Sequence, residues 1–144
     1  MITGDMHSIN KVNFAILNWF GLDLAPRFTN FQDQLKHLYC GVDKEKYANF
    51  LIPPSGQIDR ELIISEKDNI DRVVATLGLK EISQSTLVRK LNTLSGHHRT
   101  RKAILEFDKL IRSIYTLRYL RDPQLQRNVH RSQNRIGSTI NCVQ

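Results

Sequence analysis

The sequence of 144 residues lacks most conventional catalytic signatures, but one acidic residue stands in a setting that suits chemistry. Asp5 follows a candidate strand end over residues 1–4, lies close to His7 and precedes a helical pattern. A carboxylate in such a position is a common way to present an oxygen ligand to Mg²⁺. On the residues alone, a surface or capping role for Asp5 is the alternative interpretation.

Other candidate chemical groups have simpler explanations. No glycine-rich phosphate loop, Cys-x-x-Cys pair or His-Glu-x-x-His motif occurs in the sequence. His97 and His98 are adjacent, so on a helix end they point in different directions and favour a solvated pair over a metal site. Phe14, Trp19 and Phe20 could stack on bases, but their helical spacing favours packing in a core.

The positive charge is concentrated in the last third of the chain. The 98 residues before Arg99 hold 11 basic and 11 acidic residues, whereas the remainder holds 10 basic and 3 acidic residues. The whole formal net charge of +7 therefore lies from Arg99 onward. A localised positive field attracts polyanions, of which nucleic acid is the usual one. A solvated helix surface is the alternative explanation.

The elements that must position these residues are mainly helical. Apolar spacing and end signals predict the following helices: 9–20 ending at Gly21, a short helix capped by Asn30, 65–78 with a capping box at Ser65 and Asp68, 83–96, 100–121, and a last helix beginning at Asp122-Pro123. Residues 22–25, closed by Pro26, are predicted as a short strand, and residues 40–58 show no periodicity. The predicted apolar stripe of helix 100–121 consists of Ala103, Phe107, Leu110, Ile114 and Leu117.

Composition places the chain among soluble globular proteins. With 40% hydrophobic and 24% charged residues, one domain of this length can bury a real core. The apolar runs are too short to span a bilayer, and the first residues have no secretory leader. Cys40 and Cys142 lie far apart and form no metal-ligand pair, which is typical of a reducing compartment. We therefore expect a cytoplasmic protein with no membrane association.

Five segments resemble the Tn-three family of replicative DDE transposases. Gly4-Asp5-Met6-His7-Ser8, followed by Asn10 to Phe14, is similar to the family's Thr-Asp-Thr-His-Gly…Val-Asn-Phe motif. Further segments resemble the family in the same order: Phe14 to Arg27 with its Ala25-Pro26-Arg27 ending, Gln84 to Leu91, Thr100 to Tyr115, and Gln133-Asn134-Arg135. Together these segments extend from residue 4 to residue 135, over nearly the whole length of the chain.

This resemblance implies a ribonuclease-H-like fold with a helical insertion between the second and third catalytic carboxylates. In that family an Asp-Asp-Glu set holds two Mg²⁺ ions, which clamp the attacking and leaving oxygens during DNA strand nicking and strand transfer. Asp5 falls on the second aspartate and is the implied metal ligand. The implied organisation is a ribonuclease-H-like remnant over 1–30, a helical insertion over 31–121 and a C-terminal core helix over 122–144. The fold class is thus mainly α, with one or two short strands near the N-terminus.

The departures from the family pattern concern catalysis directly. Position 137, where the family places its catalytic glutamate, is Gly137, which supplies no side-chain oxygen. The first aspartate would lie before Met1, and Gly4 and Ser8 replace the expected Thr and Gly. We therefore expect the C-terminal region of a transposase that handles DNA in transposition, but that neither binds Mg²⁺ productively nor cuts DNA alone.

Other functions are open at this stage. One is a DNA-binding module without catalysis, whose predicted DNA contacts are Arg99, Arg101, Lys102, Arg112, Arg127, Arg131 and Arg135. Another is an interaction protein that self-associates or joins a full-length transposase. A further alternative is that the reading frame has decayed and that its product is scarcely stable.

Overall fold

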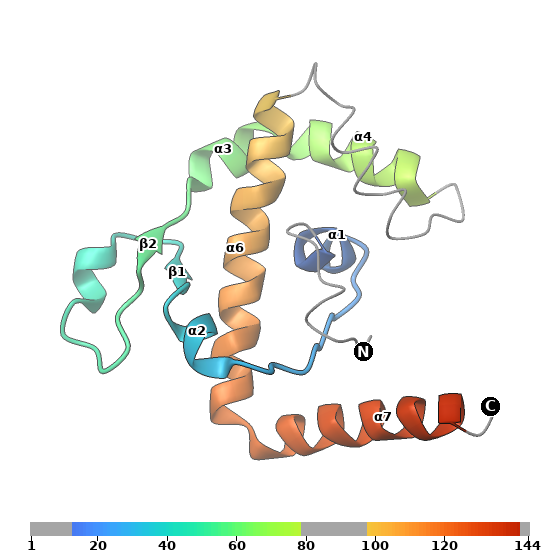
Figure 1. Ribbon diagram of the computed structural model, residues 1–144. Coiled ribbons are helices and arrows are strands. Elements are labelled where there is room, and N and C mark those ends of the chain that lie inside the picture. Colours follow the sequence, from blue (N-terminus) through green and yellow to red (C-terminus); the bar gives the residue numbers. More distant parts are fainter. Residues whose placement is uncertain (1–12, 79–97, 142–144) are drawn as a thin grey trace.

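The computed structural model describes residues 13–78 and 98–141 (Figure 1). The described elements, in chain order, are α1 (Asn13–Trp19), α2 (Phe31–Leu35), β1 (Tyr39–Cys40), the 3-10 helix η2 (Lys44–Tyr47), β2 (Gly56–Gln57), α3 (Arg60–Ser65), α4 (Lys67–Gly78), α6 (His98–Arg121) and α7 (Pro123–Asn141). The prediction of a mainly α fold with a small sheet is confirmed. The predicted helix over 83–96 and the candidate strand over 1–4 lie outside the described residues.

Helix α6 is the axis around which the other elements are arranged (Figure 1). Its 24 residues extend over about 36 Å at the usual rise of a helix. At one end α3 and α4 pack against it, and at the other end α7 leaves it at a steep angle. Helix α1 lies beside α6, between α4 and α7.

Helix α1 ends where the sequence predicts. Gly21 has a φ of 74°, the left-handed conformation that glycine adopts without a steric penalty. The Gly21 N–H donates to the Asn18 carbonyl at 2.9 Å, and the Leu22 N–H donates to the Leu17 carbonyl at 2.8 Å. This pair of hydrogen bonds is the Schellman arrangement, which satisfies carbonyls that a helix end otherwise leaves unpaired.

The strands are not where the sequence predicts them. Residues 22–25 form no strand, and only Leu24 makes an isolated bridge. The paired strands are instead β1 and β2, which lie parallel, with Tyr39 opposite Gly56. The Tyr39 ring lies so close to Gly56 that a Cβ there would come within 2.9 Å of it. Two-residue strands carry no alternating pattern, so sequence periodicity could not predict them.

The start of the α3–α4 segment also differs from the prediction. Ser65 does not cap a helix; it is the last residue of α3, and its hydroxyl donates to the Leu62 carbonyl at 3.0 Å. The helical segment begins earlier, where the Asp59 carboxylate accepts a hydrogen bond from the Leu62 N–H at 2.9 Å. Asp59 is a standard N-cap residue, because its side chain satisfies a free backbone donor of the first turn.

Two other helix starts are correctly predicted. Helix α7 begins at Pro123, and the Asp122 carboxylate accepts hydrogen bonds from the N–H groups of Gln124 and Leu125 at 2.9 and 3.1 Å. Helix α2 begins directly after Asn30, although the Asn30 side chain donates to the Asp33 carboxylate and accepts no backbone N–H.

Two hydrophobic clusters lie along α6 and share α1. The first is aliphatic and contains Ala15, Ile16, Leu62, Ile70, Val74, Ala103 and Ile104. The second is rich in aromatic residues and contains Phe14, Leu24, Ala25, Phe28, Tyr115, Tyr119 and Val129. Because Phe14 lies in one cluster and Ala15 and Ile16 in the other, α1 joins the two.

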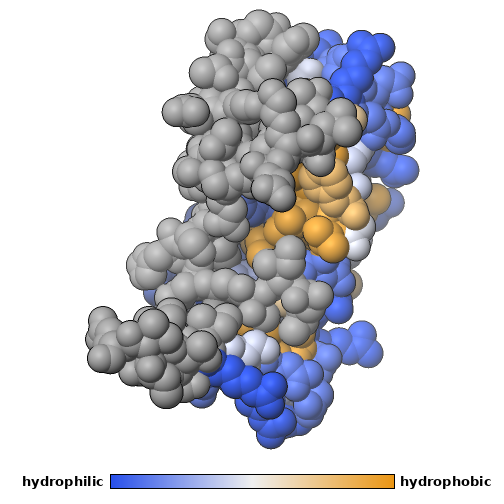
Figure 2. Space-filling view, turned by 90° about the vertical axis from the view of Figure 1, so that its right-hand side faces the viewer, coloured by the Kyte–Doolittle hydropathy of each residue, from blue (hydrophilic) through white to orange (hydrophobic). Residues whose placement is uncertain are grey.

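The predicted apolar stripe of α6 is partly wrong. Ala103 is fully buried, but Ile114 and Leu117 are exposed, and the buried face continues through Tyr115 and Tyr119. Elements pack on more than one side of α6, so a single-sided stripe does not describe it. On the face shown in Figure 2, apolar surface lies in the middle, with hydrophilic residues toward both ends. Within the described residues, no helix has the length and apolar character needed to cross a membrane.

Candidate nucleic-acid interface

The predicted DNA-binding residues fall into separate groups on the structure. Arg99, Arg101 and Lys102 lie in the first turns of α6, whereas Arg127 and the arginines after it lie on α7. The 24 residues of α6 place its two ends about 36 Å apart. The cations therefore do not form one patch.

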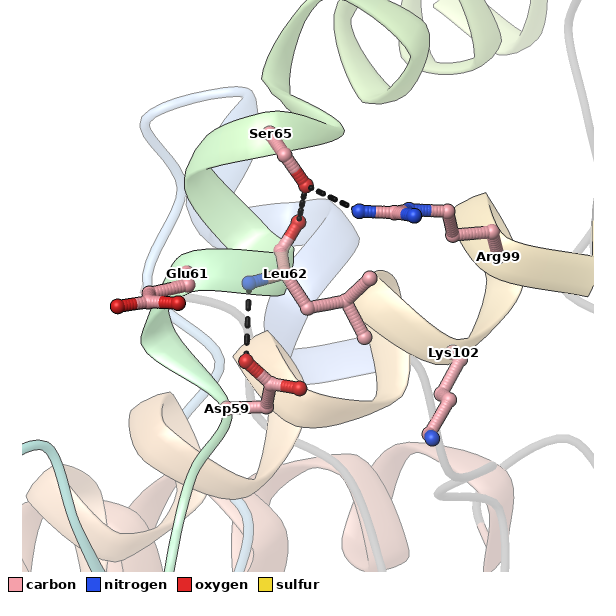
Figure 3. Close-up of a pocket in the computed structure, with 6 residues that line it drawn as sticks. All are labelled: Asp59, Glu61, Leu62, Ser65, Arg99 and Lys102. Atoms are coloured by element: carbon pink, nitrogen blue, oxygen red, sulfur yellow. Dashed lines mark hydrogen bonds between the residues drawn. The ribbon is translucent and has the colours of Figure 1, made fainter.

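A first groove lies where α3 approaches the start of α6 (Figure 3). It has a volume of about 560 Å³ and is lined by Asp59, Glu61, Leu62, Ser65, Arg99 and Lys102. The Arg99 guanidinium turns toward α3, where it donates to the Ser65 hydroxyl at 3.2 Å and pairs with Glu66 at 3.1 Å. The Lys102 side chain points away from these hydrogen-bonded groups (Figure 3).

A second groove lies on the neighbouring face of α6, beside β1. It also has a volume of about 560 Å³ and is lined by His37, Tyr39, Lys102, Leu105, Glu106, Asp108, Lys109 and Arg112. Lys102 lines both grooves and makes no ion pair with a described carboxylate. Lys109 lies with its ammonium 5.1 Å from the centre of the Tyr39 ring, so a cation and an aromatic face lie together on one wall.

The surface of the second groove is cationic although its lining contains two carboxylates. The Lys109 and Arg112 side chains are 40% and 27% exposed, whereas those of Glu106 and Asp108 are 11% and 4% exposed. Lys109 pairs with Glu106 at 2.6 Å, and Arg112 pairs with Asp108 at 3.0 Å. The positive ends therefore face solvent while the negative ends are turned inward.

The inward carboxylates hold other elements in place. Glu106 accepts a hydrogen bond at 2.9 Å from the N–H of Asp59, the residue that caps α3. Asp108 accepts one at 3.1 Å from the N–H of Ala15, in the first turn of α1. A carboxylate at a helix start is favourable, since free N–H groups and the helix dipole meet it there. These two residues thus attach α3 and α1 to α6.

Asp108 is the most strongly perturbed acid of this set. Burial raises the pKa of Asp108 from 3.8 to about 6, while the charge of Arg112 and the backbone N–H donors of α1 act in the opposite direction. Desolvation disfavours the ionised form, and the pairing only partly compensates for it. The Asp108–Arg112 pair is therefore a costly buried element that serves to fix geometry.

Arg112 is one of the predicted DNA contacts, and its side chain makes internal contacts in the structure. Its guanidinium is bound to Asp108 and lies 5.4 Å from the centre of the Phe14 ring. A side chain committed to a buried carboxylate loses an internal partner if it turns to a phosphate. The structure thus favours a structural role for Arg112.

Helix α7 presents its cations on one face. Arg127, Arg131 and Arg135 are four residues apart and lie on the side opposite Val129, which is fully buried against α6. Arg127 donates to the Gln124 side chain at 2.8 Å, and all three arginines are exposed. This face is a second cationic surface, separate from the grooves.

Sequence reasoning missed Lys109, His37 and Tyr39 among the residues of the second groove. Lys109 follows Lys102 by seven residues, so the two lie on the same side of α6, and this spacing was the signal available. His37 and Tyr39 come from a segment more than 60 residues away in the chain and gave no such signal. Only the packing of β1 on α6 brings them to Lys102.

The predicted catalytic positions are covered only in part. Asp5, the predicted metal ligand, lies outside the described residues, as do His97 and residues 84–91. Gly137 lies within α7, whose backbone is helical there. No three His, Cys, Asp or Glu side chains of the described chain are grouped so that they could hold a metal ion. The residues described here therefore do not by themselves fit a two-metal site.

Comparison with known proteins identifies the class of protein. Residues 1–141 match the family described as the Tn3 transposase DDE domain. The match covers nearly all of the 144 residues, so this chain belongs to that family, in agreement with the motif resemblance.

Individual relatives are distant and much longer. The chain is 25% identical over 131 residues to the transposase for transposon Tn2501 of Escherichia coli, and 23% identical over 128 residues to that for Tn1546 of Enterococcus faecium. It is also 23% identical over 122 residues to the transposase for Tn501 of Pseudomonas aeruginosa. These alignments cover 85–90% of this chain but only 12–13% of each relative. No solved structure matches the chain significantly.

Proposed function

We propose that this chain contacts DNA during transposition of the Tn3 type, and that its described part is a DNA-contacting helical region. The observation that carries the proposal is the family match over residues 1–141. Its physical support is the position of Lys102, between two grooves from which cations face solvent. A cytoplasmic location beside the nucleoid belongs to the same proposal, since DNA is the expected partner.

The proposed contacts are to the phosphate backbone. Lysine and arginine side chains on a helix release counterions from DNA when they neutralise phosphates, which gives affinity without sequence preference. Lys102 and Lys109 on α6 would neutralise phosphates in the second groove. Lys109 is 40% exposed and its ammonium has three N–H donors, so it could reach a phosphate and keep its contact with Glu106. Arg127 and Arg131 on α7 would contact a separate stretch of backbone, because they lie near the other end of α6.

Fluorescence anisotropy with a labelled duplex tests this proposal. Replacing Lys102 and Lys109 together by alanine should weaken binding and reduce the slope of log affinity against log salt by about 2, since each lost phosphate contact removes roughly 0.9. The matched control is Lys36→Ala with Lys67→Ala, because both lysines are exposed on other elements and pair locally, with Asp33 and Asp71. Absence of binding at about 50 mM salt, or equal loss in the control, contradicts the proposal.

We also propose that the chain alone does not cut DNA. The support is Gly137, which takes the position of the family's third carboxylate and leaves that position without a metal ligand. This proposal also includes a ribonuclease-H-like core in which Asp5 is one ligand of the family's Mg²⁺ ions. With the third carboxylate lost, the chain does not hold these ions productively. Labelled transposon-end DNA incubated with the chain and Mg²⁺ or Mn²⁺ should stay intact. Specific nicking that Asp5→Ala abolishes would overturn it.

A second candidate function is a contact with another transposase molecule. Its support is a row of exposed apolar side chains on α6, formed by Ile114, Leu117 and Leu120. Exposed apolar surface of this kind is typical of interaction sites. If this face joins two proteins, Leu117→Glu should abolish co-purification with an intact relative and leave DNA binding unchanged. Co-purification that survives this substitution would remove the candidate.

A further inference from the structure

The loop between β1 and β2 carries an exposed apolar tip. Residues 41–55 stand out from α6 on the side away from α1 (Figure 1). At the tip, Phe50 is 60% exposed and Leu51 is 98% exposed. Two large apolar side chains in water at one loop tip are unfavourable by themselves, so their presence calls for a partner.

The tip is held in shape by its own hydrogen bonds. The Asp43 carboxylate caps η2 by accepting from the Glu45 N–H at 3.2 Å, and the Phe50 N–H donates to the Tyr47 carbonyl at 3.0 Å. The rings of Tyr47 and Phe50 meet edge to face, with their centres 5.2 Å apart. This edge-to-face contact fixes Phe50 and leaves Leu51 projecting, so little ordering entropy remains to be lost on binding.

The base of the loop is equally well attached. The Ser55 N–H and hydroxyl both donate to the Leu38 carbonyl, at 2.8 and 2.9 Å, and the Ile58 N–H donates to Cys40 at 3.0 Å. Beyond this base the Tyr39 N–H donates to Ser113 on α6 at 2.8 Å. The loop thus projects from a fixed attachment to the helix that carries the second groove.

Charges of both signs lie near the tip, whereas cations lie at the base of the loop. Lys44 and Lys46 are exposed on η2, and their charges offset those of Asp43 and Glu45 beside them. The positive charge that faces solvent is at the base of the loop, where β1 borders the second groove with its Lys102 and Lys109. A polyanion lying in that groove would pass next to the loop.

We propose that Phe50 and Leu51 form a wedge that inserts into a base step of duplex DNA whose phosphates lie along the second groove. The inference rests on the proposed DNA contact and adds a mode of binding to it. Proteins that distort DNA insert apolar side chains of this type between bases, unstack one step and kink the duplex. The Tyr47 ring, which contacts Phe50 edge to face, would hold the inserted ring in place.

The size of the tip favours DNA over a protein partner. A stable protein interface buries about 800 Å² on each side, whereas two side chains such as Phe50 and Leu51 offer roughly 300 Å². One base step needs only one or two inserted side chains. The nearby cationic groove supplies the charge complementarity that a phosphate backbone requires.

A duplex containing 2-aminopurine at its central step tests the wedge with the full 144-residue chain. Because this base brightens when it unstacks, bound wild-type protein should raise its fluorescence about twofold or more, whereas Phe50→Ser with Leu51→Ser should not. The double variant should also bind roughly tenfold more weakly, but with an unchanged salt slope, since no phosphate contact is lost. The control is Ile64→Ser, an exposed apolar residue on α3.

The outcomes separate the wedge from the proposed function. Wild-type binding without a rise in fluorescence, or a rise that survives in the double variant, overturns the wedge and leaves DNA binding intact. No binding at all overturns both. A wild-type chain that self-associates in light scattering, and becomes monomeric only in the double variant, assigns the tip to a protein contact and overturns the wedge. The wild-type chain, the double variant and the Ile64→Ser control should unfold at the same temperature by circular dichroism, which shows that the substitutions do not disturb the fold.

Discussion

Different kinds of interaction hold the two halves of α6 in place. The half next to α3 and α4 packs aliphatic side chains and carries the inward carboxylates Glu106 and Asp108, which bind the starts of other helices. The half next to α7 packs aromatic rings, and its buried polar contacts include a neutral one, from the Tyr115 hydroxyl to the Pro26 carbonyl at 2.7 Å. The first half therefore depends on ionisation and the second on ring packing.

The difference between the two halves of α6 bears on the proposed DNA contact. The half stabilised by charge is also the half that borders the two grooves, so internal carboxylates and outward lysines share one helix face. Lys109 illustrates this arrangement, because it contacts Glu106 on one side and the Tyr39 ring on the other. The aromatic half contributes rigidity at the junction with α7 and leaves the arginines of α7 exposed.

The largest expected effect is in the aromatic half. Phe28 lies at the centre of this cluster, with ring centres 5.1–5.6 Å from those of Tyr119, Tyr115 and Phe31. Phe28→Ala should lower the free energy of unfolding by about 4 kcal/mol, because it leaves a cavity among rings. Urea unfolding followed by circular dichroism measures the loss. A loss below about 1 kcal/mol would show that the rings do not pack as described.

In the charged half, Asp108→Ala should cost about 3 kcal/mol at pH 7. The loss comes less from the pair itself than from what remains, namely a half-buried Arg112 and an unpaired N–H at Ala15. The same urea titration measures it. If Arg112→Met in the Asp108→Ala background fails to recover part of the loss, the orphaned guanidinium is not its cause.

The pH dependence should also distinguish the two halves. Folded Asp108 keeps its proton up to about pH 6, whereas the unfolded chain releases it near 3.8, so stability from this residue falls as pH rises through that window. The expected loss is on the order of 2 kcal/mol and should be absent in Asp108→Asn. Unfolding of both proteins at pH 4.5 and pH 7 measures the difference. Parallel pH profiles for the two proteins would contradict the raised pKa.

The smallest expected effect is that of Tyr115→Phe, which removes the hydrogen bond to Pro26 and should cost about 1 kcal/mol. Burial raises the pKa of Tyr115 well above its ordinary value, so the hydroxyl stays protonated and the cost should not change between pH 4.5 and 7. Combined with Asp108→Ala, the losses should add, because the residues lie two helical turns apart. If the two losses in unfolding free energy differ strongly from additivity, the two halves of α6 are energetically coupled and not independent.

Local signals in the sequence predicted the helix ends well. Gly21 ends α1, and Asp122 with Pro123 starts α7, because capping depends on residues within one turn of the helix. The prediction was wrong at Ser65, because the helical segment begins earlier and Asp59 caps α3. Glu106 also binds the Asp59 N–H from 47 residues away, a contact that local sequence does not reveal.

The candidate site, like the helix ends, was predictable only in part. Lys102 could be named from the charge excess alone, and the structure places it between two grooves. Arg112 belongs to the same charge excess but faces a buried carboxylate, and no composition rule separates the two residues. The strands β1 and β2 were missed because each has only two residues, and the contact that attaches β1 to α6 comes from Ser113, 74 residues away.

The sequence by itself determined the family, the helical class, the basic last third and most helix ends, since motifs and caps are read over a few neighbouring residues. Only the tertiary structure decided which cations face solvent and where the small sheet forms. The physical reason is distance along the chain: Asp108 meets Ala15 across 93 residues and Tyr39 meets Ser113 across 74, so burial and pairing there depend on packing.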